Sequence, residues 1–148
     1  MLWARSETFP RPMSHPIVFN YPAILVATLA GFFLGGLWYS PVMFGHAWMR
    51  ANALTADSLK ARGHPAMIFG GAFFLTLIMA FNLAAFLSGP PNLGWGATAG
   101  CLVGAGWVGL SLGVIYLFER KPAGLFFINA GYMSVAFTMM GAIIGAWK

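Results

Sequence analysis

Acidic and nucleophilic side chains are too few and too scattered in this sequence to suggest catalysis. The chain of 148 residues has three carboxylates, Glu7, Asp57 and Glu119, and no two of them are close in the sequence. Hydrolysis and group transfer need a nucleophile, a base and an orienting group that come together in space. We therefore expect no enzymatic activity.

Metal ligands are equally sparse. His46 and His64 flank a polar segment and could bind a metal or haem, but histidines isolated in a loop more often bind neither. Cys101 is the only cysteine and lies inside an apolar run, so it forms no disulfide within the chain. We expect no metal site and no cofactor.

Aromatic side chains gather between Trp38 and Trp48, where the first apolar run ends. This stretch holds Trp38, Tyr39, Phe44 and Trp48 together with a proline and a glycine. Tryptophan and tyrosine concentrate at the two surfaces of a bilayer, where one end of the ring system is apolar and the other is wet. We interpret the stretch as an aromatic belt, with a specific lipid or quinone site as the alternative.

The composition of the chain indicates a membrane protein. Hydrophobic residues make up 59% and charged residues 7% of the sequence, whereas a soluble domain carries about 25% charged residues. The net charge of +5 comes from cations in short segments between apolar runs, which is typical of topology signals. We expect contact with the lipid bilayer and no binding of nucleic acid.

Helix breakers divide the apolar sequence into four spans. Asn20 and Pro22 are typical of a helix start, and Pro41 ends the first run. Residues 63–118 carry no charged side chain, and as one helix they would measure about 84 Å, against a bilayer core of about 30 Å. The chain must therefore turn back at the breaker cluster 88–92. We predict an all-α membrane protein with four transmembrane helices, at about 18–40, 66–88, 93–118 and 123–147.

The remaining segments connect or precede these spans. Residues 44–64 are the most polar part of the body, and Thr55 and Asp57 are typical of a helix start. We predict a short interfacial helical segment there, with a solvated loop as the alternative. Residues 1–16 contain prolines and show no periodicity, which predicts a flexible leader before a single domain at 17–148. Met13 is an alternative start of translation.

Four spans place the loops 41–65 and 119–122 on the same side of the membrane. That side carries Arg50, Lys60, Arg62, Arg120 and Lys121, whereas the other side carries Arg5, Arg11 and Lys148. Cytoplasmic loops are enriched in Lys and Arg. We therefore expect a multi-pass protein of the bacterial cytoplasmic (inner) membrane, with both loops in the cytoplasm and both termini outside.

Small residues recur every four positions on all four predicted helices, which is typical of close helix contact in membranes. The helix at 93–118 has two adjacent rows, so we predict that it is the central helix of the bundle. One row contains Ala97, Cys101, Ala105, Gly109 and Gly113, and the other contains Gly96, Gly100 and Gly104. Such rows suit packing within the chain, with contact to a second copy or to another membrane protein as the alternative.

Because four spans place the loops 41–65 and 119–122 on the same side, the polar ends of the later helices should lie near the aromatic stretch. Glu119 opposes the dipole at a helix end, so we expect it to pair with Arg120 or Arg50. Asn129 lies in the first turns of the last helix, where it would cap loop carbonyls or contact a lipid head group. The predicted interfacial site comprises Trp38, Tyr39, Ser40, Pro41, Phe44, Gly45, Trp48, Arg50, Glu119, Arg120, Asn129 and Tyr132.

Four motifs resemble a known family. Gly35 to Trp48 follows the pattern G-x-L-W-Y-S-P-x-x-F-G-x-x-W, which resembles the signature of a bacterial membrane family known as domain of unknown function 1761. Leu117 to Pro122, Phe127 to Tyr132 and the terminal G-A-I-I-G-A-W-K resemble the second half of that family. The resemblance covers roughly residues 17–148. It implies a small multi-pass inner-membrane protein and brings no activity, cofactor or catalytic residue.

These features leave three functions open. The first is a non-enzymatic structural or accessory subunit that contacts a partner through its small-residue helix faces and basic loops. The second is a small transporter or channel that acts as an oligomer, which would need a water-accessible cavity lined by Thr76, Ser134 or Thr138. The third is a lipid- or quinone-binding protein.

Overall fold

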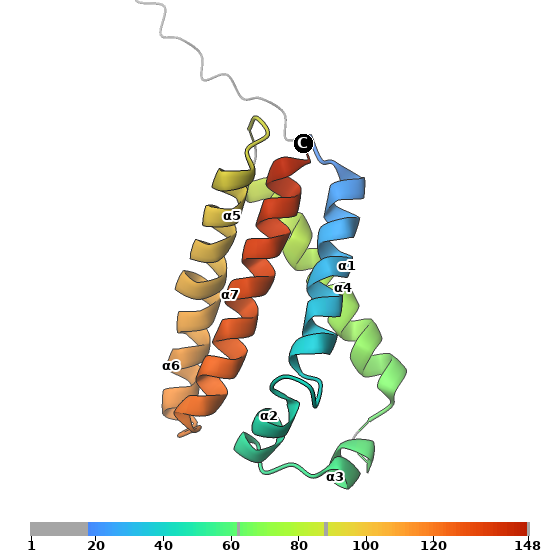
Figure 1. Ribbon diagram of the computed structural model, residues 1–148, viewed down its shortest axis with the longest axis vertical. Helices are drawn as coiled ribbons and strands as arrows, with labels where there is room; N and C mark the ends of the chain where they lie inside the picture. The colour runs from blue at the N-terminus through green and yellow to red at the C-terminus, as the bar shows by residue number, and fades with distance from the viewer. Residues whose placement is uncertain (1–17, 62, 88, 148) are drawn as a thin grey trace, which may run out of the picture.

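The computed structural model describes residues 18–61, 63–87 and 89–147, and the regular structure of these residues is helical (Figure 1). The predicted leader at 1–16 lies outside the described residues. The elements are α1 (Tyr21–Trp38), α2 (Gly45–Ala51), α3 (Ala56–Ala61), α4 (Pro65–Phe86), α5 (Leu93–Cys101), the π-helix η1 (Leu102–Gly109), α6 (Leu110–Phe118) and α7 (Ala123–Ala146).

In the part of the chain that the structure describes, four helices are long and apolar enough to cross a membrane. They are α1, α4, the continuous helix Leu93–Phe118 formed by α5, η1 and α6, and α7. Each begins and ends within three residues of its predicted range. The prediction of an all-α protein with four transmembrane helices is confirmed.

Side-chain caps mark the starts of α1 and α3, whereas α2, α4 and α7 begin without one. The Asn20 side chain accepts a hydrogen bond from the Ala23 backbone N–H at 3.1 Å and so caps α1, as expected. Thr55 Oγ1 accepts from the Ser58 N–H at 3.2 Å before α3. The segment after α1 therefore contains two short helices, α2 and α3, and is not merely a loop.

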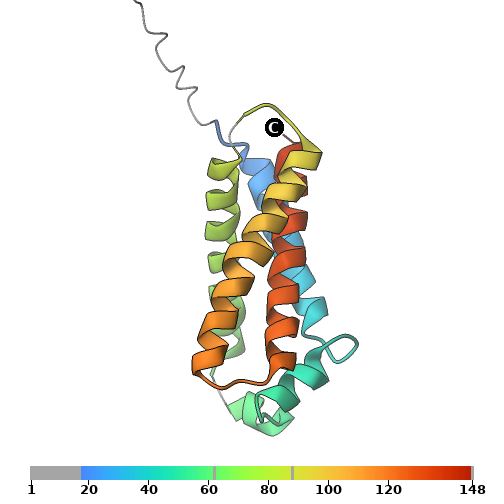
Figure 2. The ribbon, with the colours of Figure 1, turned by 90° about the vertical axis from the view of Figure 1, so that its left-hand side faces the viewer.

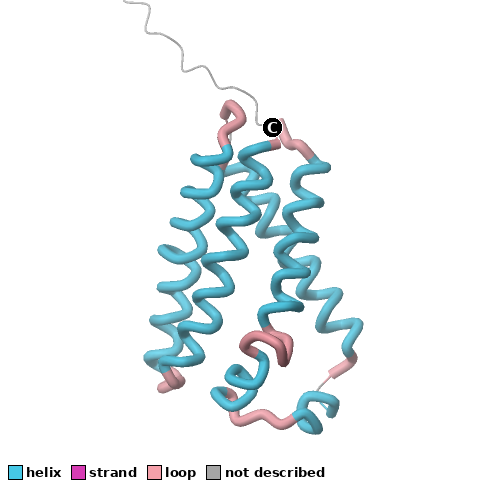
Figure 3. Tube along the Cα trace, in the orientation of Figure 1, coloured by secondary structure: helices cyan, strands magenta, loops and turns pink. Residues whose placement is uncertain are grey.

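The two ends of the bundle carry different elements. The start of α1, the turn before α5 and the end of α7 lie at the top of Figure 1, and α2, α3 and the loop 119–122 lie at the bottom. Figure 3 shows the same division between the upper loops and the lower interfacial helices. The aromatic stretch and the 119–122 loop thus share one end, as the parity of four spans requires.

The central helix is α7, and the prediction that the helix at 93–118 is central is wrong. α7 contacts α1, α2, α4 and each part of the α5–η1–α6 helix. Figures 1 and 2 show it alongside both α1 and α5. The glycines at 96, 100 and 104 all face the α7 backbone. A glycine-rich face therefore shows how closely two helices approach and not how many neighbours a helix has.

The π-helix η1 merges the two predicted glycine rows into a single face. Gly96 and Gly104 lie against the α7 backbone, and Gly109 of the other row lies against Ala130 of α7. An α-helical row advances by four residues, whereas Gly104 and Gly109 are five apart. A π-helix bonds residue i to i+5 and so accommodates the extra residue. This irregularity keeps one glycine face on α7 along the whole span.

α1 and α4 are close at the upper end of the bundle and diverge toward the loops. Ile24, Ala80 and Leu83 belong to the buried core at the upper end. Toward the other end of α4, residues 65–72 are all exposed, and Thr76 is its first buried residue. Figure 1 shows α4 leaving the bundle toward α3. The divergence leaves space between the two helices beside the aromatic stretch.

Candidate functional site

The turn that follows α1 is held by backbone hydrogen bonds, which explains part of the first motif. The Phe44 N–H donates to the Trp38 carbonyl at 3.0 Å, and the Gly45 N–H donates to the Ser40 carbonyl at 2.9 Å. The Ser40 hydroxyl donates to the carbonyl three residues earlier at 2.6 Å. A Cβ at Gly45 would lie 2.5 Å from the Tyr39 carbonyl oxygen, so this position requires glycine.

Trp38 attaches this turn to α7. Its indole N–H donates to the Ile128 carbonyl at 3.0 Å, and its ring centroid lies 4.8 Å from that of Phe44. Gly131 leaves room for the indole, because a Cβ there would lie 3.3 Å from the ring. Trp38 therefore makes a specific helix contact in addition to its place at the end of a span.

Tyr39, Asn129 and Tyr116 form a chain of hydrogen bonds from the end of α1 through α7 to α6. The Tyr39 hydroxyl donates to Asn129 Oδ1 at 2.9 Å, and Asn129 Nδ2 donates to the Tyr116 hydroxyl oxygen at 2.7 Å. Asn129 thus bonds two phenols, and the prediction that it caps loop carbonyls is wrong. Tyr116 is missing from the predicted site because it lies in an apolar run without a motif.

Its surroundings fix Tyr39 as a hydrogen-bond donor. Burial raises the pKa of the Tyr39 phenol, and the neighbouring Tyr132 and Tyr116 raise it further. The Trp48 ring covers it edge-on at a centroid distance of 5.9 Å. A tyrosine phenol is protonated at neutral pH in any case, and the raised pKa lets Tyr39 keep its proton, and its bond to Asn129, at more alkaline pH.

Tyr132 completes the aromatic cluster from α7. Its ring centroid lies 5.3 Å from that of Tyr39 and 6.4 Å from that of Trp38. Its hydroxyl reaches the Gly31 carbonyl of α1 at 3.3 Å. Gly35 makes this approach possible, because a Cβ there would lie 3.0 Å from the Tyr132 hydroxyl oxygen. The structure therefore brings the aromatic members of the predicted site into contact.

The charged members of the predicted site lie at the same end of the bundle but outside this cluster. Arg50 is in the last turn of α2, and Glu119 and Arg120 follow α6, and all three are exposed. Pro41 is exposed on the turn after α1. The hydrogen bonds that join Tyr39 to α6 and α7 involve none of these side chains. The predicted site thus divides into a half-buried aromatic part and an exposed part.

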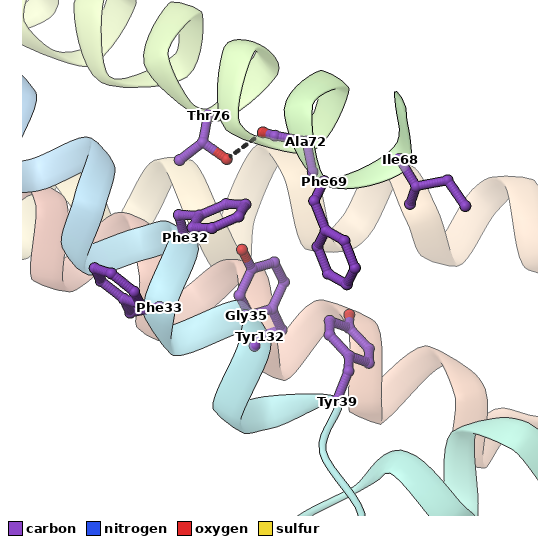
Figure 4. Close-up of a pocket in the computed structure, with 10 residues that line it drawn as sticks. Phe32, Phe33, Gly35, Tyr39, Ile68, Phe69, Ala72, Thr76 and Tyr132 are labelled. Atoms are coloured by element: carbon purple, nitrogen blue, oxygen red, sulfur yellow. Dashed lines mark hydrogen bonds between the residues drawn. The ribbon is translucent and has the colours of Figure 1, made fainter. Parts of the chain in front are cut away.

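A pocket of about 420 Å³ lies between α1 and α4, beside the aromatic cluster (Figure 4). This volume falls in the range of about 300–1,000 Å³ that is usual for ligand sites. Tyr39, Thr76 and Tyr132 are its polar side chains. The pocket is lined by Phe32, Phe33, Gly35, Gly36, Tyr39, Ile68, Phe69, Ala72, Thr76 and Tyr132.

The sequence indicates only part of this pocket. Tyr39 and Tyr132 belong to the predicted site, and Thr76 of α4 is expected only as the lining of a transport cavity. Ile68, Phe69 and Ala72 of α4 are not predicted. The sequence pattern of apolar residues on a membrane helix is the same whether these residues face lipid, a neighbouring helix or a cavity. The α4 wall exists because α4 diverges from α1, which depends on packing at the other end of the bundle.

A protein family described as "Protein of unknown function (DUF1761)" has a model that matches residues 22–145. The match includes the aromatic stretch, the 119–122 loop and nearly all of α7. Neither a curated protein nor a solved structure matches the chain.

Proposed function

The chain belongs to this family of unknown function, and we propose that it is a membrane protein that binds a lipid-like molecule between α1 and α4. The pocket of about 420 Å³ carries the proposal, because the part of its wall that the structure describes is apolar apart from three side chains. A lining of this kind suits an apolar ligand with a single polar group. Phe33 and Phe69 line the pocket and are also exposed at the surface, so a ligand can enter from the bilayer.

Transport of a hydrophilic solute has less support from the same residues. Thr76, Ser134 and Thr138 each donate a hydrogen bond to a carbonyl of their own helix, at 2.8, 2.7 and 2.6 Å. Thr76 lines the pocket, whereas Ser134 and Thr138 do not. A hydrophilic solute in this pocket would meet an apolar wall, which favours a lipid-like ligand.

The packing of the glycines within the chain weakens the hypothesis of an accessory subunit that contacts a partner through its small-residue helix faces. Gly96, Gly100 and Gly104 approach the α7 backbone so closely that a Cβ at any of them would collide with an α7 carbonyl. These glycines therefore serve packing within the chain, and a partner would need another surface, such as the exposed side of α4. Binding of a lipid-like ligand needs no such partner.

We also propose that the protein acts without catalysing a reaction, in the inner membrane of a bacterium. The polar side chains among the described residues of the pocket are two phenols and one hydroxyl, and the raised pKa of the Tyr39 phenol makes it harder to ionise as a nucleophile or base. The exposed cations Arg50, Arg120 and Lys121 lie at the α2–α3 end of the bundle, which supports a cytoplasmic position for that end.

Filling the pocket provides the test of lipid binding. Gly36 lines the pocket, and a Cβ at this position would have no neighbour within 4 Å. Gly36→Leu should therefore occupy part of the pocket without disturbing the bundle. We expect the purified wild-type protein to retain a lipid-like molecule at a fixed ratio, and Gly36→Leu to retain at most about a third as much. Solvent extraction and mass spectrometry measure the retained molecule.

Gly71→Leu is the matched control. Gly71 lies in the exposed part of α4, also has no neighbour within 4 Å of an added Cβ, and does not line the pocket. This variant should retain as much ligand as the wild type. Equal losses in the two variants, or no retained molecule in the wild type, would contradict the proposed function.

A further inference from the structure

The polar side chains of the pocket differ in how firmly their protons are engaged. Thr76 donates to the Ala72 carbonyl at 2.8 Å, and Figure 4 shows this bond along α4. Tyr39 donates to Asn129 at 2.9 Å. Both distances are normal for a hydrogen bond, so neither proton is free for a ligand unless an existing bond breaks.

The Tyr132 hydroxyl is held more weakly. Its distance of 3.3 Å to the Gly31 carbonyl exceeds the range of about 2.5–3.0 Å that is usual between two oxygens. Gly31 lies inside α1, where its carbonyl already accepts a bond from the helix. Tyr132 can therefore turn its proton toward an acceptor in the pocket at little cost.

The other lining residues restrict the charge of that acceptor. The described residues that line the pocket include no Lys, Arg, His, Asp or Glu. Among these residues, a charged head group would lack a counter-charge in an apolar setting. A neutral oxygen that accepts one hydrogen bond needs only Tyr132. The pocket therefore favours a neutral carbonyl over a carboxylate or a phosphate.

The shape of the wall favours a flat ring. Five of the ten lining residues are aromatic, and they come from all three helices that border the pocket: Phe32, Phe33, Tyr39, Phe69 and Tyr132. Aromatic side chains pack well in offset-stacked and edge-to-face contacts with another ring. Phe33 and Phe69 are at the surface, where an apolar tail can continue into the bilayer.

From these observations we infer that the ligand carries a neutral, planar, carbonyl-bearing ring on an apolar chain, and that the Tyr132 hydroxyl donates to its carbonyl oxygen. This chemistry is that of a membrane quinone. The inference rests on the proposed function, because it names the class of molecule that the α1–α4 pocket binds. Tyr132 acts here as a binding residue, and the inference includes no electron transfer.

The test compares three probes that share a ten-carbon chain. Delipidated protein in nanodiscs of synthetic phosphatidylcholine is titrated with decylubiquinone, with decanoate and with decane, and bound probe is measured by equilibrium dialysis. We expect saturable binding of one decylubiquinone per chain, and at least tenfold weaker binding of the other two probes. Tyr132→Phe should weaken decylubiquinone binding about three- to tenfold, the effect of removing one neutral hydrogen bond.

Tyr21→Phe is the control for loss of a phenol. Tyr21 is exposed at the start of α1 and does not line the pocket, so this variant should bind decylubiquinone as the wild type does. The melting temperatures of both variants, followed by circular dichroism, show whether each remains folded.

The outcomes separate the inference from the function on which it rests. Equal affinity of wild type and Tyr132→Phe for decylubiquinone overturns the role of Tyr132. Equal binding of decane and decylubiquinone overturns the carbonyl-bearing ring, while sensitivity of both to Gly36→Leu would keep the pocket as a lipid site. Lack of saturable binding for every probe, together with no retained lipid, overturns both.

Discussion

Asn129 has two kinds of hydrogen-bonding group, and the protein uses both. Its carbonyl oxygen accepts from Tyr39 and its amide nitrogen donates to Tyr116. A side-chain amide carries an acceptor oxygen and a donor nitrogen on separate atoms, so it can bond two partners at once. One residue of α7 therefore fixes the positions of two phenols that come from different helices.

Replacing Asn129 should destabilise the protein. Asn129→Leu leaves the hydroxyls of Tyr39 and Tyr116, both partly buried, without their shared partner. We expect a loss of about 1–3 kcal/mol in the free energy of unfolding. Asn82→Leu is the control, because Asn82 is an exposed amide of α4, and it should change stability by less than about 0.5 kcal/mol. Unfolding in mixed micelles measures both free energies. Equal losses in the two variants would show that the hydrogen bonds of Asn129 do not stabilise the protein.

The aromatic residues show how far sequence reasoning reaches at this scale. Trp38, Tyr39 and Tyr132 could be placed together because the parity of the spans sets which helix ends meet. The partners of Asn129 could not be predicted, because the rotation of each helix about its axis is not visible in a nearly uniform apolar sequence. Tyr116 and the α4 wall of the pocket were missed for this reason.

At the scale of elements, the contact of α5 and η1 with α7 is the closest in the bundle. Gly100 meets the Phe137 carbonyl, and Gly96 and Gly141 meet each other across the interface. The bounds of these helices could be predicted because Pro, Gly and Asn mark their ends. The π-helix could not, because a single extra residue in a glycine-rich run leaves no pattern of its own.

Glycine substitutions should affect stability on the face of this helix that packs against α7 and not on the opposite face. Gly100→Ala places a methyl group on the Phe137 carbonyl oxygen, and we expect it to destabilise the protein by about 1–3 kcal/mol or more. Gly106→Ala places the same group where nothing lies within 4 Å, so stability should be unchanged or slightly higher. Thermal unfolding followed by circular dichroism compares the two variants, and similar melting temperatures would contradict the close α5–α7 contact.

For the whole molecule, the separation of elements between the two ends of the bundle makes the proposed orientation testable. Ala56 lies at the start of α3, and Pro91 lies in the turn before α5 at the other end. In a Cys101→Ala background, a membrane-impermeant maleimide should label Pro91→Cys in intact bacterial cells. It should label Ala56→Cys only after the cells are opened. If only Ala56→Cys were labelled in intact cells, the orientation would be opposite to the one proposed.

The central position of α7 also has a consequence for biosynthesis. The ribosome delivers α1, α4 and the α5–η1–α6 helix before the span that all of them contact. Until α7 enters the membrane, the glycine face of the α5–η1–α6 helix can only be filled by lipid tails. The α1–α4 pair can pack earlier, but the α5–η1–α6 helix can join the bundle only after α7 has entered the membrane.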